Sequence, residues 1–316
     1  MYIIWNLTRV CPWNCDFCCV SAIQAKRRNG NRNTVFAEQK KKELTLNQKI
    51  EVLKMMASKN IIIDFSGGDP LYFQDDFEVV KKATEIIPSK MINISMTGCG
   101  ITQDKVNLLK KVNMVEFTLD NLPEVENPFR PQGFNIASMR AMTKLVKAGV
   151  KVSAVTILYS VTITKTNLKS IYTWLCNNRI QEWDILKYLP VGRGINYQEL
   201  APTNKQYLAT MYYLRSLNGF THISFQHSLK VIDGSAKCHA AINSFGILPD
   251  GEAIACAWAL DLNGRPINEF RIGKLPEENI DVIIERAHNN LGFNNQMDYC
   301  RVNRCAIARQ KTKEKI

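Results

Sequence analysis

The sequence lacks any apolar run long enough to cross a membrane, and its longest runs, such as Ile61-Ile62-Ile63, span only a few residues. Its first residues lack the positive segment, long apolar core and small-residue cleavage site of a secretory signal. Glycine and proline are scattered, and 22% of the residues are charged, which excludes a disordered composition. We therefore expect a soluble, cytoplasmic protein without a membrane partner.

The chain has 316 residues, of which 46% are hydrophobic, so it can bury one large core or two moderate ones. In the cytoplasm, its ten cysteines argue against a disulfide framework and favour metal ligation or redox chemistry. Four of them lie between Cys11 and Cys19, and four more follow residue 237. Only Cys99 and Cys176 stand apart, and the helical pattern around Cys176 indicates a small core residue.

The formal net charge of +12 is compatible with an acidic partner, either a nucleic acid or an acidic peptide. It is equally compatible with a thiolate-bound iron–sulfur cluster, whose negative charge the count omits. None of the basic segments is interleaved with aromatic residues that would stack on bases, so a nucleic-acid partner is disfavoured.

Short β-rich runs alternate with amphipathic helical patterns, which is typical of βα units and a parallel sheet. Thr45 and Gln48 form a predicted capping box at the start of one helix, and Gly149 ends another. Six such units favour an α/β fold, an open, partial (βα)6 TIM-like barrel, with its chemistry at the carboxyl ends of the strands. The predicted strands are Ile3–Thr8, Ile61–Ser66, Ile92–Met96, Val115–Leu119, Val150–Leu158 and Asp184–Leu189, and the predicted helices are Asn47–Ala57, Phe77–Ile87, Asp104–Val112, Ile136–Ala148 and Leu168–Asn177.

Two segments depart from this alternation. The connection from Ser21 to Lys42 is polar, basic and weakly periodic, which is compatible with a lid, a substrate-docking segment or a simple loop. After about Pro202 a helix over Lys205–Leu217 and a short strand lead into a cysteine-bearing region. We therefore divide the chain into residues 1–202, the barrel, and residues 203–316, a smaller second domain.

A group of three cysteines follows the first predicted strand, in the segment Cys11-Pro-Trp-Asn-Cys15-Asp-Phe17-Cys18. Three closely spaced thiolates can ligate three irons of a [4Fe-4S] cubane and leave the fourth iron open, whereas cubanes are normally held by four cysteines. The alternative is structural zinc, which usually takes four ligands in two separated pairs.

The loop resembles the defining motif of the radical S-adenosylmethionine (radical SAM) superfamily, including the aromatic Phe17 before the third cysteine. Further segments resemble this family in the same order along the chain, each at the end of a predicted strand. The resemblance implies that Gly67, Gly68, Asp69 and Pro70 hold the methionyl amino group, with Asp69 in place of the usual Glu, and that Thr118 contacts the ribose. Thr97-Gly98 matches a Thr-Asn-Gly turn without its Asn, and Pro190-Val-Gly192-Arg193 matches a Pro-x-Gly-Arg segment that would place Arg193 among the cofactor-binding residues.

The family resemblance implies one initiating step. The open iron chelates S-adenosylmethionine, and the reduced cluster donates an electron to its sulfonium. Cleavage gives methionine and a 5′-deoxyadenosyl radical that abstracts a substrate hydrogen, while the protein supplies positioning and electrostatics. A reducing partner such as flavodoxin or ferredoxin is implied with it.

A second group of cysteines, Cys238, Cys256, Cys300 and Cys305, can fully coordinate one more [4Fe-4S] cluster. Pro249-Asp250-Gly251 predicts a hairpin between the first two. The pattern resembles the SPASM extension in its shortened "twitch" form, including Ile272-Gly273-Lys274-Leu275. Four residues separate the last two cysteines, where two are more usual. A four-cysteine zinc site and unligated core cysteines are the alternatives.

The leading functional hypothesis is a maturase that crosslinks, forms a thioether in, or epimerises a ribosomally made peptide. The alternative, by resemblance, is a radical dehydrogenase of a small molecule such as an aminocyclitol, with the auxiliary cluster as electron acceptor. A scaffold or RNA-binding protein without turnover is a third possibility. Cys19 and Cys99 are candidates for hydrogen-atom donation to a product radical, and Cys99 is the preferred catalytic candidate because it follows a strand end.

Overall fold

The computed structural model describes residues 1–25, 27–28, 31–32, 34–238, 240–289 and 300–302. These residues contain one ten-stranded sheet, in the order β11-β10-β9-β8-β7-β6-β1-β12-β13-β14. Six neighbouring parallel strands in it confirm the predicted partial (βα)6 barrel, and their bounds agree with the prediction to within two residues. These strands are β1 (Tyr2–Thr8), β6 (Ile62–Gly67), β7 (Ile92–Met96), β8 (Met114–Thr118), β9 (Val152–Leu158) and β10 (Glu182–Lys187).

The two faces of the barrel strands differ in polarity. In β1, Ile3, Trp5 and Leu7 are fully buried and belong to the main hydrophobic core, where each such side chain contributes about 1.5–3 kcal/mol. The alternate residues Tyr2, Ile4 and Asn6 line the interior of the barrel instead. Because successive side chains alternate across a strand, this one pattern both stabilises the fold and leaves a polar interior.

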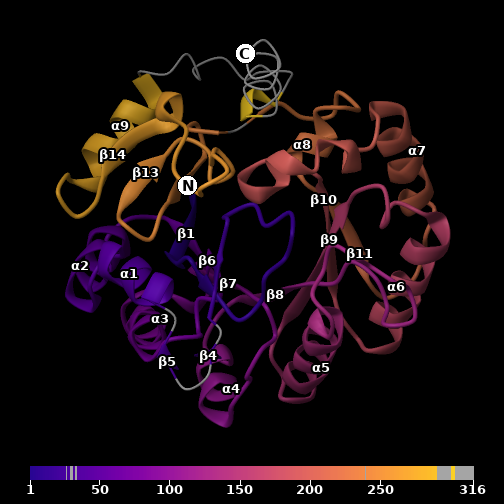
Figure 1. Ribbon diagram of the computed structural model, residues 1–316, viewed down its shortest axis with the longest axis horizontal. Helices are drawn as coiled ribbons and strands as arrows, with labels where there is room; N and C mark the ends of the chain where they lie inside the picture. The colour runs from indigo at the N-terminus through magenta and orange to yellow at the C-terminus, as the bar shows by residue number, and fades with distance from the viewer. Residues whose placement is uncertain (26, 29–30, 33, 239, 290–299, 303–316) are drawn as a thin grey trace.

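Helices form the outer layer around these strands (Figure 1). The predicted capping box is confirmed, because the Thr45 hydroxyl accepts from Gln48 N at 3.4 Å and Gln48 Oε1 accepts from Thr45 N at 2.9 Å. The five predicted helices are also present with small shifts of their ends. They are α2 (Leu46–Ala57), α3 (Gln74–Ile86), α4 (Gln103–Leu109), α5 (Phe134–Lys147) and α6 (Lys165–Asn177), with a 3-10 turn, η1 (Ser89–Met91), before β7.

The described residues between 21 and 42 contain more secondary structure than the weak periodicity of this connection predicted. After β2 (Val10–Cys11) it contains β3 (Ile23–Gln24), β4 (Arg27–Arg28), β5 (Asn31–Arg32) and the helix α1 (Thr34–Lys42). Alanine, Glu, Gln and Lys are strong helix formers, which explains a helix without a regular apolar stripe. The following Glu43 ties it to the barrel, because its Oε1 accepts from Thr8 Oγ1 at 3.0 Å and from Arg9 N at 2.9 Å.

The strands after residue 202 extend the same sheet at both edges. β11 pairs with β10 and β12 pairs with β1, both in parallel, and the predicted hairpin is confirmed by the antiparallel pair β12–β13. Strands from both sides of residue 202 thus belong to one sheet, and the division into two domains stays a prediction. This part contains η2 (Gly192–Asn196), η3 (Gln198–Leu200), α7 (Asn204–Arg215), β11 (His222–Phe225), α8 (His227–Lys230), β12 (Ser244–Ile247), β13 (Glu252–Ile254), η4 (Asn268–Phe270), β14 (Arg271–Lys274) and α9 (Ile280–Asn289).

Across the described residues, the helices are too short or too polar to span a lipid bilayer.

Candidate functional site

Cys11, Cys15 and Cys18 line a single cavity of about 600 Å³ at the carboxyl-terminal mouth of the barrel. Cys11 and Cys15 are buried and Cys18 is half-buried. Two of the sulfur atoms accept backbone hydrogen bonds, Cys11 Sγ from Trp13 N at 3.4 Å and Cys18 Sγ from Ala22 N at 3.3 Å. Backbone donors of this kind stabilise negative charge on sulfur, and hydrogen bonds to the sulfurs help tune iron–sulfur clusters.

Burial raises the pKa of both Cys11 and Cys15 above the ordinary value of a thiol. A bound metal offsets this penalty, because ligation requires and stabilises the thiolate form. Within the described ranges, no three His, Cys, Asp or Glu side chains converge as they do around a single metal ion. A cubane places each thiolate on a different iron, so its ligands are spread more widely than those of one ion. The buried loop over an open cavity therefore fits a cubane.

The aromatic residue of the loop, Phe17, anchors it to the barrel. Its ring centroid lies 4.8 Å from that of Tyr159 and 5.6 Å from that of Tyr188, both in edge-to-face contact. Phe17 is buried, with 4% of its surface exposed, and it also borders the cavity. It thus fixes the position of the neighbouring Cys18 through packing.

Gly67 and Gly68 allow the end of β6 to approach the backbone that leads to Cys11. A Cβ atom on Gly67 would lie 2.3 Å from Thr8 O, and one on Gly68 would lie 2.1 Å from Val10 O. Gly67 also has a φ of 126°, which side-chain-bearing residues rarely adopt. Both glycines line the cavity, so the close approach shapes its wall beside the cysteine loop.

Asp69 is fully buried, and its carboxylate is occupied by neighbouring groups. Its Oδ2 accepts from Thr97 Oγ1 at 2.5 Å and from Thr97 N at 3.4 Å, while Oδ1 accepts from Leu71 N at 3.1 Å. Burial raises the pKa of this carboxyl. Among the described residues that line the cavity, neither Asp69 nor the buried Pro70 is present. Asp69 therefore connects the ends of β6 and β7.

Thr97 and Thr118 both line the cavity, from the ends of β7 and β8. Cys99 lies two residues beyond Thr97 and is half-buried, but it is not part of the described cavity wall. Cys19 does line the cavity, and burial raises the pKa of its thiol to about 12. The catalytic role of Cys99 stays a prediction.

Arg193 contacts the backbone of the cysteine loop. Its Nε and Nη2 donate to Cys15 O at 3.1 and 2.7 Å, and its Nη1 donates to Ala22 O at 2.5 Å. The preceding Gly192 permits this contact, because a Cβ there would lie 2.3 Å from Cys19 O. The Pro-x-Gly-Arg segment thus clamps the loop that carries the cysteines.

Sequence reasoning missed Arg130, which lies in the irregular segment between β8 and α5. Its side chain is 8% exposed, borders the cavity and forms an ion pair with the fully buried Asp120 at 2.6 Å. The guanidinium stacks over the rings of Phe17 and Phe134, at 4.6 and 4.7 Å from their centroids. Its Nε donates to the same Asp120 oxygen, also at 2.6 Å. A buried cation that is paired with Asp120 therefore lies beside the cysteine loop.

Arg130 also acts on the nearest cysteine. Its charge and its hydrogen bond to the sulfur oppose the effect of burial on the pKa of Cys15. No motif marks this arginine, and the only signal was a basic residue soon after the strand that ends at Thr118.

Three members of the second group of cysteines interact electrostatically. Burial is the largest cause of the raised pKa of Cys256, and the charges of Cys300 and Cys238 raise it further. All three are half-buried. Cys305 and His239 lie outside the described residues. The neighbouring Ala257 and Trp258 line the same cavity as the first cysteine group.

Comparisons with known proteins agree with this geometry. The family model described as "Radical SAM superfamily" matches residues 5–175. Fe-coproporphyrin III synthase of Methanosarcina barkeri is 27% identical over 173 residues, which are 54% of this chain and 38% of that protein.

Two solved structures share the fold at low sequence identity. SuiB of Streptococcus suis, bound to precursor peptide SuiA, has a TM-score of 0.64 and 13% identity over 93% of this chain and 66% of its own. Native anSMEcpe with bound AdoMet and Cp18Cys peptide has a TM-score of 0.62 and 14% identity over 92% of this chain and 82% of its own. The chain spans less than two thirds of the length of the synthase and of SuiB.

Proposed function

This chain belongs to the radical SAM superfamily, and from that premise we propose that it cleaves S-adenosylmethionine reductively to modify a ribosomally synthesised peptide. The 5′-deoxyadenosyl radical so formed removes a substrate hydrogen, leading to a crosslink, a thioether or an epimerised residue. The observation that carries the proposal is the convergence of three cysteines, two glycines and two threonines on one cavity at the mouth of a parallel barrel.

Cys11, Cys15 and Cys18 would hold a [4Fe-4S] cluster, which supplies the electron for cleavage when bound. Three kinds of contact hold the cysteine loop in position for this cluster. Phe17 packs the loop onto the barrel, Arg193 clamps its backbone, and two backbone N–H groups point at sulfur.

The remaining wall residues suit S-adenosylmethionine. Gly67 and Gly68 leave room for it beside the cysteine loop. Thr97 borders the cavity, and its hydroxyl donates its hydrogen to Asp69. The lone pairs of that hydroxyl can therefore accept a hydrogen bond from the methionyl ammonium. Asp69 then orients the Thr97 hydroxyl and does not contact the ammonium itself. This indirect contact explains how an acid one carbon shorter than the family's usual Glu can serve here. Thr118 is assigned to the ribose. Arg130 is assigned to the carboxylate, because that is the one anionic group of S-adenosylmethionine and Arg130 is a buried cation that borders the cavity beside Cys15.

The proposal extends to the carboxyl-terminal part of the chain. Cys238, Cys256 and Cys300, together with Cys305, would hold an auxiliary [4Fe-4S] cluster of the SPASM or twitch type within residues 203–316. The mutual influence of the first three thiols supports this assignment. A small electron-transfer protein such as flavodoxin or ferredoxin would reduce the clusters.

A peptide substrate is supported by two considerations. The structures of SuiB and anSMEcpe, which share the fold over more than nine tenths of this chain, each contain a peptide. The net charge of +12 also favours encounter with an acidic leader segment.

The test is anaerobic incubation of reconstituted enzyme with reductant, S-adenosylmethionine and candidate precursor peptides. We expect a change in peptide mass, or deuterium uptake from D2O, that requires Cys15. A two-dalton loss from an aminocyclitol, with no peptide changed, would instead assign the chain to small-molecule dehydrogenation.

A further inference from the structure

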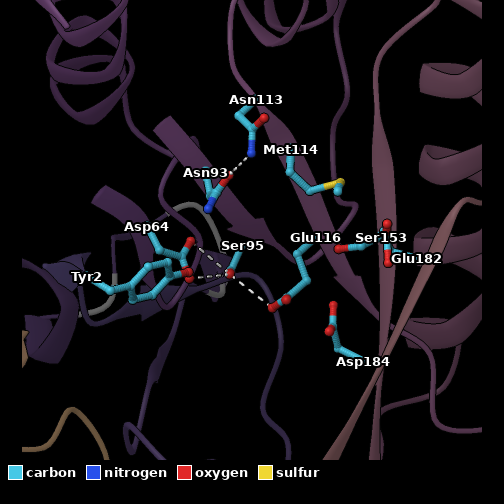
Figure 2. A pocket seen from close by; sticks show the side chains of 10 residues that line it. All are labelled: Tyr2, Asp64, Asn93, Ser95, Asn113, Met114, Glu116, Ser153, Glu182 and Asp184. Atoms are coloured by element: carbon cyan, nitrogen blue, oxygen red, sulfur yellow. Dashed lines mark hydrogen bonds between the residues drawn. The ribbon is translucent and has the colours of Figure 1, made fainter. Parts of the chain in front are cut away.

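A second cavity of about 300 Å³ lies in the barrel interior, towards the amino-terminal ends of the strands (Figure 2). It shares part of its wall with the cavity that the cysteine loop borders, here called the upper cavity. The shared residues are Tyr2, Asp64, Ser95, Glu116 and Asp184. Nothing in the proposed handling of S-adenosylmethionine uses this lower part.

Four carboxylates line the lower cavity (Figure 2). Glu182 pairs with His222, and the other three, which also line the upper cavity, are Asp64 on β6, Glu116 on β8 and Asp184 on β10. Ser95 Oγ lies 3.1 Å from both oxygens of Asp64 and 3.1 Å from Glu116 Oε1. A hydroxyl has one hydrogen to donate, so it cannot satisfy all three oxygens. The hydroxyl of Tyr2 is a second donor to Asp64, so among the described residues Glu116 depends on the one shared hydroxyl of Ser95.

These carboxylates also lack the counter-charge that other buried acids of this protein have. Asp76 pairs with Lys49 at 2.5 Å, and Asp120 pairs with Arg130 at 2.6 Å. In contrast, none of the ion pairs among the described residues involves Asp64, Glu116 or Asp184.

The cations that act on Asp184 do not form an ion pair with it, although Lys230 also borders the upper cavity. The hydroxyl of Ser224 donates to Asp184, and His222 and Lys230 influence this carboxylate only from beyond ion-pair distance. Burial of an unpaired carboxylate is costly, and a cationic partner in the cavity would offset that cost.

The wall above the carboxylates is apolar on one side. Val155 and Ile157 on β9 and Leu186 on β10 line the upper cavity, between the carboxylates and the mouth of the barrel. Leu186 follows Asp184 by two residues and therefore shares its inward face. An aliphatic stem that ends in a charged group matches this combination of apolar wall and acidic floor.

We propose that the barrel interior binds the ammonium or guanidinium end of a substrate side chain, with Asp64, Glu116 and Asp184 as acceptors. The proposal rests on the proposed function and specifies its substrate class: a peptide that inserts a lysine or arginine side chain beneath the cysteine loop. The buried cation anchors the substrate, and its aliphatic stem then lies along Val155, Ile157 and Leu186. The carboxylates are therefore specificity-determining residues.

The experiment measures binding to the reconstituted holoprotein by calorimetry, without S-adenosylmethionine. The probes are Nα-acetyl-lysine amide, its neutral counterpart Nα-acetyl-norleucine amide, an aminocyclitol and Mg2+. The variants Glu116→Gln and Asp184→Asn remove one charge each at nearly constant shape. Glu85→Gln, which removes an exposed carboxylate that pairs with Lys82, is the matched control.

We expect the lysine probe to bind and the norleucine probe not to bind. Each interior substitution should weaken the lysine probe about tenfold, as for the loss of one charge-assisted contact, and Glu85→Gln should leave its affinity unchanged. If the aminocyclitol binds more tightly with the same dependence, the cation comes from a small molecule and the peptide assignment is overturned. The proposal would also be overturned by equal binding of the lysine and norleucine probes, or by an affinity for the lysine probe that is unchanged in Glu116→Gln and Asp184→Asn. Binding of Mg2+ at these residues would overturn it as well.

Failure of this proposal is distinguishable from failure of the proposed function. Cleavage of S-adenosylmethionine is measured separately as 5′-deoxyadenosine, and it requires no cation in the lower cavity.

Discussion

Arg193, on η2, donates two hydrogen bonds to the carbonyl oxygen of Cys15, at 3.1 and 2.7 Å, across 178 residues of the chain. A third bond, to Ala22 O at 2.5 Å, holds the other end of the cysteine loop. The planar guanidinium fork makes these contacts simultaneously, which an ammonium group cannot do. The geometry of the first cysteine group therefore depends on a residue outside it.

Replacing Arg193 by Lys retains the charge but removes the fork. We expect the free energy of unfolding to fall by about 2 kcal/mol and the iron content after reconstitution to fall with it. Urea unfolding and iron analysis measure the two effects. Arg215→Lys is the control, because Arg215 pairs with Asp233 in an exposed position where such pairs contribute less than about 1 kcal/mol. If Arg193→Lys had the stability and iron content of the wild type, the proposed role of Arg193 in holding the cysteine loop would be contradicted.

Gly68 tests the close approach of β6 to the cysteine loop. In Gly68→Ala, the new Cβ would lie 2.1 Å from Val10 O, so the backbone on one side must shift. We expect a loss of about 3 kcal/mol or more in the free energy of unfolding. In Gly100→Ala the new Cβ meets only Lys105 Nζ, at 4.0 Å, and the left-handed φ of 63° should cost only about 1 kcal/mol. Equal losses in the two variants would show that the approach is not tight.

Asp64 gives stability an unusual dependence on pH. Burial raises its pKa from 3.8 to about 6, so the folded protein binds this proton more tightly than the unfolded chain does. The free energy of unfolding therefore falls as pH rises between these two values, and the penalty is complete above about pH 6. Asp64→Asn removes it, so the variant should gain about 3 kcal/mol at pH 8 but only about 1 kcal/mol at pH 4.5.

Urea unfolding at these two pH values checks the difference. Asp281→Asn, which removes an exposed carboxylate, should show little gain at either pH. A gain for Asp64→Asn that is independent of pH would contradict the assignment.

Arg130 is assigned to the carboxylate of S-adenosylmethionine. In Arg130→Lys, we expect the Kd of S-adenosylmethionine to rise about tenfold and the Kd of its decarboxylated analogue to stay unchanged, because only the former carries the group in question. Anaerobic calorimetry on reconstituted protein measures both. Arg179→Lys, at a cation–π contact with Phe220 outside the cavity wall, should affect neither ligand. Equal weakening of both ligands would instead assign Arg130 to folding of the site.

The sequence allowed the regular parts of this molecule to be predicted because their signals are local. Alternating apolar residues located the six barrel strands, and Thr45 with Gln48 marked a helix start that the structure confirms. The cysteine spacing and the turn at Asp250 were equally local signals. The helix α1 was not predicted. It is held to the barrel by the hydrogen bond between Glu43, which follows it, and Thr8, and these two residues are distant from each other in the sequence.

Parts of the site that depend on long-range contacts could not be predicted in the same way. Arg193 was predicted to be a cofactor-binding residue, and that role stays a prediction. The structure shows it bound to the backbone of the cysteine loop, a contact that no spacing encodes. Asp64 and Glu116 are visible in the sequence as a single charged residue within each apolar strand. The register of the strands is needed to show that both side chains point into the barrel interior.

The most direct test of the account is the formation of 5′-deoxyadenosine by anaerobically reconstituted protein with dithionite and S-adenosylmethionine. We predict turnover by the wild type and by Cys176→Ala, since Cys176 lies on α6 away from the cavity wall, and none by Cys11→Ala, Cys15→Ala or Cys18→Ala. Absence of 5′-deoxyadenosine from the iron-loaded wild type, or its undiminished formation by the three variants, would contradict the account.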